Sequence, residues 1–376
     1  MRINIVLGPF LPVPAVLGGA VEKAHLLLAR YYKAAGHDVT IVSRRYGTFP
    51  ADEIVDKIRY LRIPSFNRSA SLLVNLAFDF LYSCRVSFSL PQADVTVTNS
   101  FFLPLVLARR KAGKIYVQVG RYPKGQMALY RRADRIQAVS WAVADEIARQ
   151  TPRVARKVVM IGYAIPPAYF KTDEQPQRQK TILFVGRIAR EKGIELLLKA
   201  FLSLTREENI PNLSDWKLRI IGPYDITQGG DGNGYFDELK KIADAIGAAC
   251  ELVGPVFVQQ TLVDEYRAAS VFVYPSLAET GEALPLAPLE AMAAGCATIV
   301  SNLRCFDDYI TDGVSGLKFD HRGSRPEDDL ADKLARLIAD PEFVQRLAAN
   351  GNSSAQNYQA PIIARKMLDD FEALVR

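Results

Sequence analysis

Two glutamates flank the expected start of an apolar helix in the second half of the chain. Glu282 and Glu290 stand eight positions apart in EALPLAPLEAMAAG, which follows the strand-like run VFVYPS at 271–276. Prolines suit the first turn of a helix and a glycine suits the position after its last turn, so this segment predicts a helix that begins near residue 286. The free N–H groups and the positive dipole of such an N-terminus form an anion site that fits a diphosphate.

The two glutamates suit different contacts. Glu290 lies one turn into the expected helix, where a carboxylate can accept hydrogen bonds from two neighbouring ribose hydroxyls, as acidic residues do in dinucleotide-binding folds. Glu282 lies on the preceding loop, where a carboxylate can contact sugar hydroxyls or stabilise positive charge at a reacting carbon. Taken alone, Glu290 is explained about as well by compensation of the helix dipole, and Glu282 by a solvated loop acid.

A basic segment follows another strand-like run. In GRIAREKG, Gly186 and Arg187 come directly after ILFV, and Lys192 stands five residues beyond Arg187 at the start of a helix. Two cations at the carboxyl ends of strands can hold a diphosphate as charge develops on it. Each cation alone is also explained by an exposed basic loop.

A glycine pair closes the long loop after the first strand. Gly18 and Gly19 end the stretch 7–20, directly before a helical pattern. Glycines let a ligand approach the backbone closely, so we expect this loop to contact the same ligand. Two adjacent glycines are a weak motif by themselves.

These residues depend on an alternation of strands and helices for their positions. Between the first two strand-like runs, apolar residues recur at helical spacing, which indicates a strand–helix–strand unit and hence a parallel sheet with helices on both faces. The expected strands are 3–8, 39–44, 94–99, 114–120, 135–140 and 157–162 in the first half, and 181–187, 218–223, 250–255, 271–276, 297–301 and 316–320 in the second.

The alternation pauses once. Residues 166–180 are polar and contain three prolines, which is typical of a linker. We therefore predict an α/β protein with two Rossmann-like, doubly wound domains, 1–165 and 181–355, that face a cleft. Residues 356–376 form a C-terminal helix that packs back on the first domain. Ligands of such sheets bind outside the carboxyl ends of the strands.

The charge is unevenly distributed. Residues 1–170 contain 24 Lys and Arg against 10 Asp and Glu, whereas residues 171–376 contain 23 against 31. An imbalance of this size is typical of a half that meets nucleic acid, acidic lipid headgroups or a phosphorylated acceptor, although surface variation is the plainer explanation.

Composition excludes several classes of protein. The chain is 49% hydrophobic and 23% charged, as expected of a folded globular protein of 376 residues. The four cysteines and three histidines show no metal-ligand spacing, so we expect no metal. We expect a cytoplasmic protein, because there is no uncharged apolar run of membrane-spanning length and the chain enters a strand without a leader.

Residues 71–90, SLLVNLAFDFLYSCRVSFSL, are unusually apolar. The sequence leaves two interpretations open: a helix packed in the core of the first domain, or an amphipathic element that contacts a bilayer surface.

Together these segments resemble the retaining nucleotide-sugar glycosyltransferases of family 4, which have the GT-B architecture. The resemblance rests on Gly18-Gly19, ADRIQAVS (133–140), FVGRIAREKG (184–193), LRIIGP (218–223) and the run at 271–320. It extends over most of the chain and is strongest from 181 to 320.

The resemblance implies roles for individual residues. Glu282 and Glu290 match the family's pair of glutamates separated by seven residues. Arg187 and Lys192 would hold the diphosphate, Glu290 the ribose and Glu282 the transferred sugar. The implied catalytic residues are Glu282, Arg187 and Lys192, and the implied donor-binding residues are Gly18, Gly19, Gly186, Arg187, Lys192, Ala283, Leu284, Leu286 and Glu290.

The match to the family pattern leaves one ambiguity of register and includes a departure in the first domain. Counting forward from the VYPS strand end selects Glu279 as the first glutamate, whereas counting back from Glu290 selects Glu282, which we prefer. The family often has a His-Asp pair at the end of a first-domain strand, and here Gln118 and Arg121 are the acceptor-side candidates instead.

The resemblance implies transfer of a hexose from a nucleoside diphosphate sugar to a hydroxyl of a glycan or lipid-linked acceptor, with retained configuration, in synthesis of a cell-surface polysaccharide or glycolipid. No cofactor beyond the sugar nucleotide and no nucleic acid are expected. The basic first domain suits the acceptor and an anionic membrane surface, as in a peripheral protein at the inner face of the membrane. The alternatives are a non-catalytic anion- or nucleic-acid-binding protein and a GT-B nucleotide-sugar epimerase.

Overall fold

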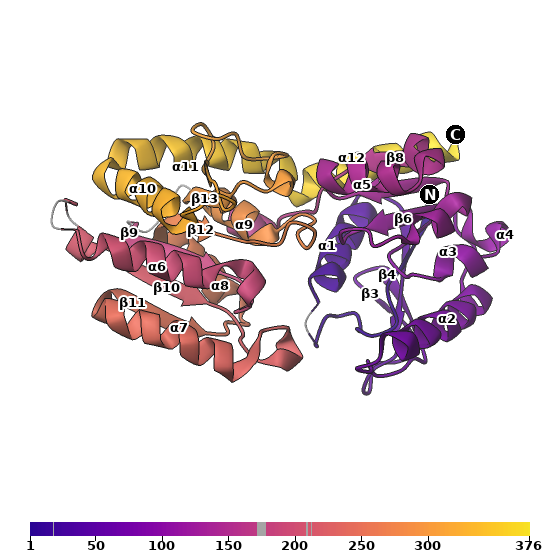
Figure 1. Ribbon diagram of the computed structural model, residues 1–376. Coiled ribbons are helices and arrows are strands. Elements are labelled where there is room, and N and C mark those ends of the chain that lie inside the picture. The colour runs from indigo at the N-terminus through magenta and orange to yellow at the C-terminus, as the bar shows by residue number, and fades with distance from the viewer. Residues whose placement is uncertain (18, 171–177, 208–209, 212) are drawn as a thin grey trace. The chain divides into compact units, whose positions relative to one another are not determined.

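A parallel sheet lies at the centre of each of two units (Figure 1). Our computed structural model describes residues 1–17, 19–170, 178–207, 210–211 and 213–376. Unit 1 contains residues 1–164 and 358–376, and unit 2 contains residues 165–357. Gly18 and the central part of the predicted linker, 171–177, lie outside the described residues. The predicted α/β fold class, with two doubly wound sheets, is confirmed.

The sheet of unit 1 has the order β3-β4-β2-β1-β5-β6-β7-β8. Neighbouring strands are parallel except β3 and β4, which pair antiparallel. The strands are β1 Arg2–Val6, β2 Asp38–Arg44, β3 Asp52–Val55, β4 Ile58–Ile63, β5 Val95–Thr98, β6 Lys114–Val119, β7 Arg135–Ala138 and β8 Val158–Met160.

The hairpin of β3 and β4 was not anticipated from the sequence. Its two turn residues, Asp56 and Lys57, both adopt positive φ, 50° and 62°. Such turns usually carry glycine or asparagine, so the sequence gives no turn signal here. Strand β3 is also short and largely exposed at the edge of the sheet, where an apolar run is not required.

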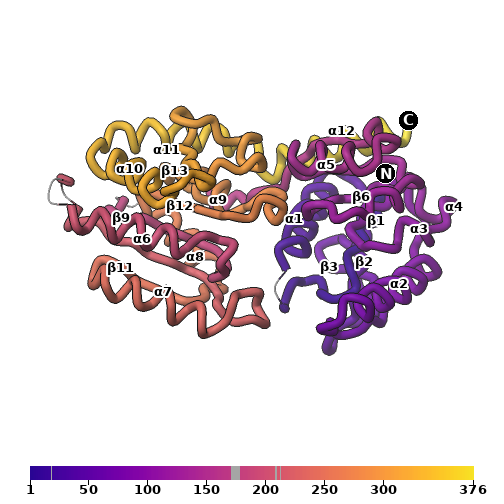
Figure 2. Tube along the Cα trace, viewed as in Figure 1, coloured from indigo at the N-terminus to yellow at the C-terminus, as the bar shows by residue number. Residues whose placement is uncertain are grey.

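The helices of unit 1 cover the sheet, and the last helix of the chain is one of them. Phe371 of this helix meets Tyr116 and Tyr32 edge-on, with ring centroids 4.9 and 5.8 Å apart, and all three rings are buried. The two chain ends lie near each other in this unit (Figure 2). The helices are α1 Ala20–Ala34, α2 Leu72–Ser89, α3 Leu103–Val106, α4 Arg109–Ala112, α5 Trp141–Gln150 and α12 Ala360–Val375.

The sheet of unit 2 is wholly parallel, with the order β11-β10-β9-β12-β13-β14. This is the doubly wound order in which the sequence direction reverses between the first and fourth strands, here β9 and β12. The strands are β9 Gln179–Val185, β10 Lys217–Ile221, β11 Cys250–Gly254, β12 Ala269–Tyr274, β13 Ala297–Ser301 and β14 Leu317–Phe319.

Helix α9 begins at Leu286, as the sequence predicts, and ends at Ala294, followed by Gly295 with a φ of 86°. It is buried on most sides because it packs against β12, β13, α8 and α11, which accounts for its nearly uninterrupted apolar sequence. The other helices of unit 2 are α6 Ile194–Leu204, α7 Gly232–Ile246, α8 Gln259–Ala268, α10 Pro326–Ala339 and α11 Pro341–Ala355.

Across the part of the chain that the structure describes, every helix is too short or too polar to cross a bilayer.

Candidate functional site

The loops that follow β9 and β12 meet at one edge of the unit 2 sheet. These two strands are hydrogen-bonded neighbours at the point where the strand order reverses. In open α/β sheets the carboxyl ends at such a point form the ligand-binding crevice. The candidate residues after Val185 and after Tyr274 therefore share one place in the fold.

A buried ion pair joins the two loops. Lys192 Nζ lies 2.5 Å from Glu282 Oε1, and the two side chains are only 7% and 9% exposed. The same oxygen accepts hydrogen bonds from Ser276 Oγ at 2.8 Å and from Tyr274 Oη at 3.1 Å. We call these four residues the Lys192–Glu282 cluster. A buried charge pair is tolerated when further hydrogen bonds satisfy its atoms, as they do here.

The cluster perturbs the tyrosine within it. Burial raises the pKa of Tyr274 well above its ordinary value, and the Glu282 carboxylate adds to that shift. The Lys192 ammonium also lies 5.5 Å from the centre of the Tyr274 ring. The phenol therefore stays protonated and donates to Glu282 at any physiological pH.

One glycine allows the loops to come together. Gly193 follows a 3₁₀ turn at Arg190–Lys192 and has a φ of 68°. A Cβ at this position would lie 2.0 Å from the carbonyl oxygen of Pro275. The Leu277 N–H donates to the Glu191 carbonyl at 2.8 Å, and this hydrogen bond holds the same two loops together. Glycine is required here both for its backbone conformation and for space.

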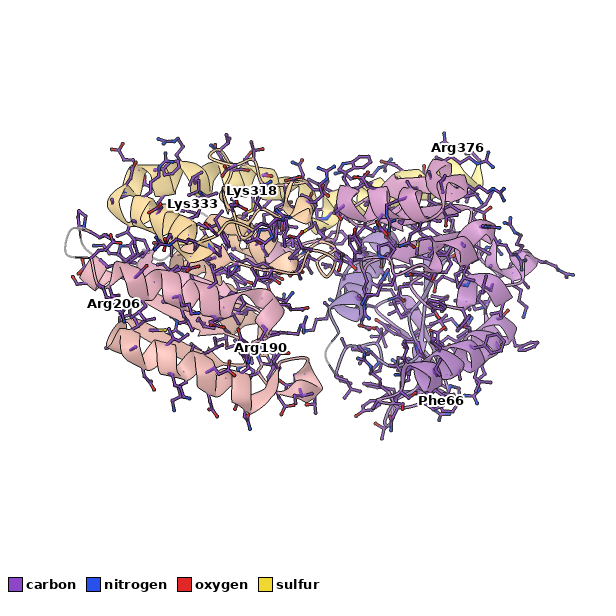
Figure 3. The ribbon with its side chains drawn as sticks, in the orientation of Figure 1. Phe66, Arg190, Arg206, Lys318, Lys333 and Arg376 are labelled. Atoms are coloured by element: carbon purple, nitrogen blue, oxygen red, sulfur yellow. The ribbon has the colours of Figure 1, made fainter. Side chains whose placement is uncertain are left out.

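The second predicted cation, Arg187, is linked to Lys192 through an acid that the sequence analysis did not single out. Arg187 Nη2 lies 2.7 Å from Glu191 Oε1, and that oxygen lies 3.7 Å from Lys192 Nζ. Arg187 also donates to the Gly229 carbonyl. By contrast, Arg190, labelled in Figure 3, forms an ion pair with Glu238 of α7 at 2.7 Å.

The backbone around the predicted phosphate site is closely packed. Gly186 donates its N–H to the Ile221 carbonyl at 3.0 Å, and its own carbonyl oxygen would lie 1.7 Å from a Cβ on Gly222. On the other loop, Ala283 and Leu284 are 8% and 5% exposed and lead into Leu286 at the start of α9. Within the described residues, no side chain caps this helix and its first turn contains no acid.

Glu290 belongs to a second network. Its Oε2 accepts a hydrogen bond from Tyr266 Oη of α8 at 3.1 Å. Burial, followed by the Glu290 charge, raises the pKa of Tyr266 and of Tyr169 well above their ordinary values. Two tyrosines thus direct the Glu290 carboxylate, one turn inside α9.

The structure separates the two candidates for the first glutamate. Glu279 is about half exposed and pairs with Arg322 and with His321 Nε2, at 2.7 and 2.8 Å. The hydrogen bond from Arg322 holds the pKa of Glu279 below its ordinary value. Glu282 is the buried partner of Lys192, and Glu279 forms a surface ion pair instead.

In unit 1 the start of α1 already carries a carboxylate. Gly19 has a φ of 110°, and a Cβ there would lie 2.2 Å from Glu22 Oε2. Burial raises the pKa of Glu22, partly offset by its own backbone N–H. Glu22 thus lies in the first turn of the helix for which the glycine pair predicts a diphosphate contact, and that contact stays a prediction.

The predicted acceptor-side residues differ in accessibility. Gln118 is buried, with Oε1 2.7 Å from His25 Nε2 and Nε2 3.2 Å from Gln137 Oε1. Burial lowers the pKa of His25 to about 4, so the ring is neutral near pH 7. Both ends of the Gln118 amide are therefore engaged inside unit 1, whereas Arg121 is exposed.

Two doubly wound α/β units, the second with cations and an uncapped helix N-terminus at its strand-order reversal, define the GT-B architecture. The chain belongs to the family described as glycosyl transferases group 1, which it matches over residues 167–354. This match confirms the predicted resemblance, and the non-catalytic alternative is not favoured.

Individual relatives are more distant. The chain is similar to the D-inositol 3-phosphate glycosyltransferase of Thermobifida fusca, with 34% identity over 47% of this chain and 38% of the relative. It is also similar to the lipopolysaccharide 1,2-N-acetylglucosaminetransferase of Salmonella typhimurium, with 32% identity over 43% of this chain and 40% of the relative. The matched region thus spans well under half of each of these relatives.

Solved structures share the fold. Anabaena Alr3699/HepE in complex with UDP-glucose superposes with a TM-score of 0.71 over 99% of this chain and all of that chain, at 14% identity. At this identity the likeness concerns the fold alone.

Proposed function

We propose that the chain is a retaining, nucleotide-sugar-dependent hexosyltransferase that acts on a hydroxyl of a glycan or lipid-linked acceptor. The observation that carries the proposal is the Lys192–Glu282 cluster beside the uncapped N-terminus of α9. A buried cation, a buried acid and free backbone N–H groups at one sheet edge match the parts of a sugar diphosphate.

The donor diphosphate would exchange partners with the protein. Lys192 and Arg187 neutralise the phosphates together with the N–H groups near Ala283 and Leu284. As Lys192 turns to phosphate, the Glu282 carboxylate becomes available to accept hydrogen bonds from the sugar hydroxyls. Glu290, directed by Tyr266, holds the ribose hydroxyls.

The transfer step needs no protein base. The bond between the anomeric carbon and the phosphate oxygen breaks, and the acceptor oxygen bonds to the same face of that carbon. The acceptor hydroxyl proton passes to the departing phosphate oxygen, whose charge Arg187, Lys192 and the helix N-terminus stabilise. We propose that these groups supply the neutralising charge without a metal, so a chelator should leave turnover unchanged.

We assign the acceptor side to unit 1 and the biological setting to synthesis of a cell-surface polysaccharide or glycolipid. The positive balance of residues 1–170 suits an acceptor or membrane that carries phosphates. The Salmonella relative is named for transfer to lipopolysaccharide, which supports this context. Arg121, exposed beyond β6, is the preferred acceptor-side residue, and the protein would be peripheral at the inner face of the membrane.

Donor identity is tested first by binding. Thermal unfolding is followed with UDP-, GDP-, ADP- and dTDP-sugars, because a ligand that binds only the folded state raises the midpoint by mass action. The correct donor should stabilise the wild type and Lys199→Ala, and fail to stabilise Lys192→Ala. Lys199 is the matched control because it is an exposed lysine on α6 of the same unit. Equal stabilisation of Lys192→Ala would overturn the site.

Turnover is tested second. With the correct donor, Lys192→Ala and Glu290→Ala should nearly abolish formation of a glycoside, and NMR of the product should show the donor's anomeric configuration. Wild-type rates in both variants, or an inverted product, would contradict the mechanism. Release of a free, altered sugar would identify the epimerase instead.

A further inference from the structure

One face of helix α2 is buried in the interior of unit 1. Asp79, Tyr82, Ser83 and Val86 are its buried residues. The Asp79 carboxylate accepts hydrogen bonds from the Phe102 N–H at 2.9 Å and from Ser100 Oγ at 3.1 Å. These contacts fix which side of the helix points outward.

The exposed face of α2 is apolar, whereas the exposed face of an ordinary surface helix is polar. Leu73 and Phe88 are 77% and 82% exposed, and Arg85 is the one charged residue among the exposed positions of this fully described helix. A helix that is apolar on both faces is normally buried on both. The large exposed apolar side chains are Leu72, Leu73, Val74, Phe80, Leu81 and Phe88.

Cations border this face. Lys111 Nζ donates to the Phe88 carbonyl at 2.8 Å, which places the exposed run Arg109–Lys111 of α4 beside the C-terminal end of α2. Arg85 donates to the Pro64 carbonyl and lies 5.1 Å from the centre of the Phe66 ring, at the edge of unit 1 (Figure 3). The one acid on α2, Asp79, is buried and turned inward.

We propose that α2 is an interfacial helix that inserts its outward face into an anionic bilayer surface. Exposed leucine and phenylalanine side chains would enter the boundary between headgroups and acyl chains, while Arg85 and the Arg109–Lys111 run contact lipid phosphates. A second copy of this chain is a poorer occupant, because it would add a second set of these cations to the contact while no exposed acid on α2 would offset them. The proposal concerns this surface alone and holds whichever sugar nucleotide is the donor.

The test measures flotation of the whole chain with vesicles, without any sugar nucleotide. Wild type should float with phosphatidylcholine vesicles that contain phosphatidylglycerol and much less with phosphatidylcholine alone. Leu73→Gln and Phe88→Gln should each lower the partition coefficient roughly tenfold. Arg110→Ala should lower it by about fivefold on anionic vesicles, because one juxtamembrane cation is worth about 1 kcal/mol.

Matched controls lie in unit 2. Ile226 and Phe257 are 73% and 69% exposed, so Ile226→Gln and Phe257→Gln remove similar apolar surface away from α2 and should float like the wild type. Thermal unfolding of each variant verifies the fold. The α2 substitutions change exposed side chains and should leave it intact.

Flotation of the Leu73→Gln and Phe88→Gln variants at the wild-type level would overturn the proposal, as would equal flotation on neutral and anionic vesicles. Analytical ultracentrifugation tests whether a second copy of this chain occupies the face instead. A wild-type dimer that Phe88→Gln dissociates, without vesicle binding, would show that the face is a self-interface and not a membrane surface. A protein that floats as expected but binds no sugar nucleotide would separate failure of the proposed transferase function from failure of this inference.

Discussion

Because the Lys192–Glu282 pair is buried, it affects the stability of the fold more than an exposed ion pair between two loops would. Exposed ion pairs contribute little because water screens them, whereas a buried charge that loses its partner is strongly destabilising. The cluster therefore couples stability to donor recognition, since the groups that stabilise each other are the groups that the donor would engage.

Neutralising either Lys192 or Glu282 should lower both the stability of the fold and the rate of turnover. Lys192→Met leaves Glu282 buried without its cation and should cost about 3–5 kcal/mol of unfolding free energy, with a loss of turnover of about 10²–10³-fold. In the double variant Lys192→Met/Glu282→Gln the uncompensated charge is gone, so stability measured by urea unfolding should largely recover while turnover stays lost. Lys199→Met is the control. Recovery of turnover in the double variant would assign the pair a structural role only.

The two candidate glutamates make a direct comparison. Glu279→Gln removes a surface pair with Arg322 and should change stability by no more than about 1 kcal/mol, with near-normal turnover. Glu282→Gln should leave kcat greatly reduced. Steady-state kinetics of the two variants side by side decide between them. Greater loss of kcat in Glu279→Gln would reverse the assignment.

His25 should make stability depend on pH. Its pKa falls from 6.5 in the unfolded chain to about 4 in the folded one because it is buried, so the folded state binds fewer protons. Stability is then complete above pH 6.5 and falls as the pH drops towards 4, by about 3 kcal/mol in all. Urea unfolding of the wild type and of His25→Gln across this range measures it. Identical pH slopes would contradict the shift.

At the residue scale, the sequence predicted the charged residues of the site but not the neighbours that hydrogen-bond or pair with them. Lys192 stood out through its place after a strand-like run and Glu282 through its spacing from Glu290. Glu191 belongs to the same GRIAREKG segment as Lys192, but nothing in that segment signals that it bridges two cations. Tyr274 and Ser276 belong to the strand-like run VFVYPS, which by itself predicts only a buried strand. Their alternate positions at the strand end put both hydroxyls on one side, which is the pattern that indicates a shared partner.

At the scale of elements, regular patterns were predictable and strained ones were not. The start of α9 followed from prolines and its end from Gly295, because these residues have fixed local preferences. The β3–β4 hairpin has Asp56 and Lys57 at positive φ, a conformation that residues other than glycine rarely adopt, so local preference does not predict it. Likewise, the position of α2 at the surface depends on which of its two apolar faces meets the sheet.

Gly193 tests how the loops are held. Gly193→Ala introduces a Cβ 2.0 Å from the Pro275 carbonyl oxygen and should separate the β9 and β12 loops, with loss of both stability and turnover. Gly313→Ala is the matched control, since Gly313 also has positive φ, 72°, but nothing within 4 Å of the added Cβ. That control should cost only the left-handed backbone strain, about 1–2 kcal/mol. If thermal unfolding and turnover respond alike in both variants, close loop approach is not the reason for the glycine.

At the scale of the whole molecule, each unit has its own core, and the chain returns to unit 1 through α12. Arg135 and Asp370 lie 2.8 Å apart, and Phe371 fills the space between Tyr32 and Tyr116. The end of the chain therefore stabilises its beginning, and unit 2 is an insertion between two segments of unit 1.

The effect of losing that contact should be confined to one unit. Phe371→Ala removes a buried ring and should destabilise unit 1 by about 3–5 kcal/mol.

The two tryptophans report the units separately, since Trp141 lies in α5 of unit 1 and the buried Trp216 precedes β10 of unit 2. In Trp141→Phe and Trp216→Phe backgrounds, urea unfolding by fluorescence should show a lower midpoint for the unit 1 probe and a nearly unchanged one for unit 2. Tyr358→Ala, at the start of the returning segment, should act in the same direction and more weakly, because Tyr358 is 8% exposed whereas Phe371 is fully buried. Equal shifts at both tryptophans would mean that the two units unfold as one cooperative body.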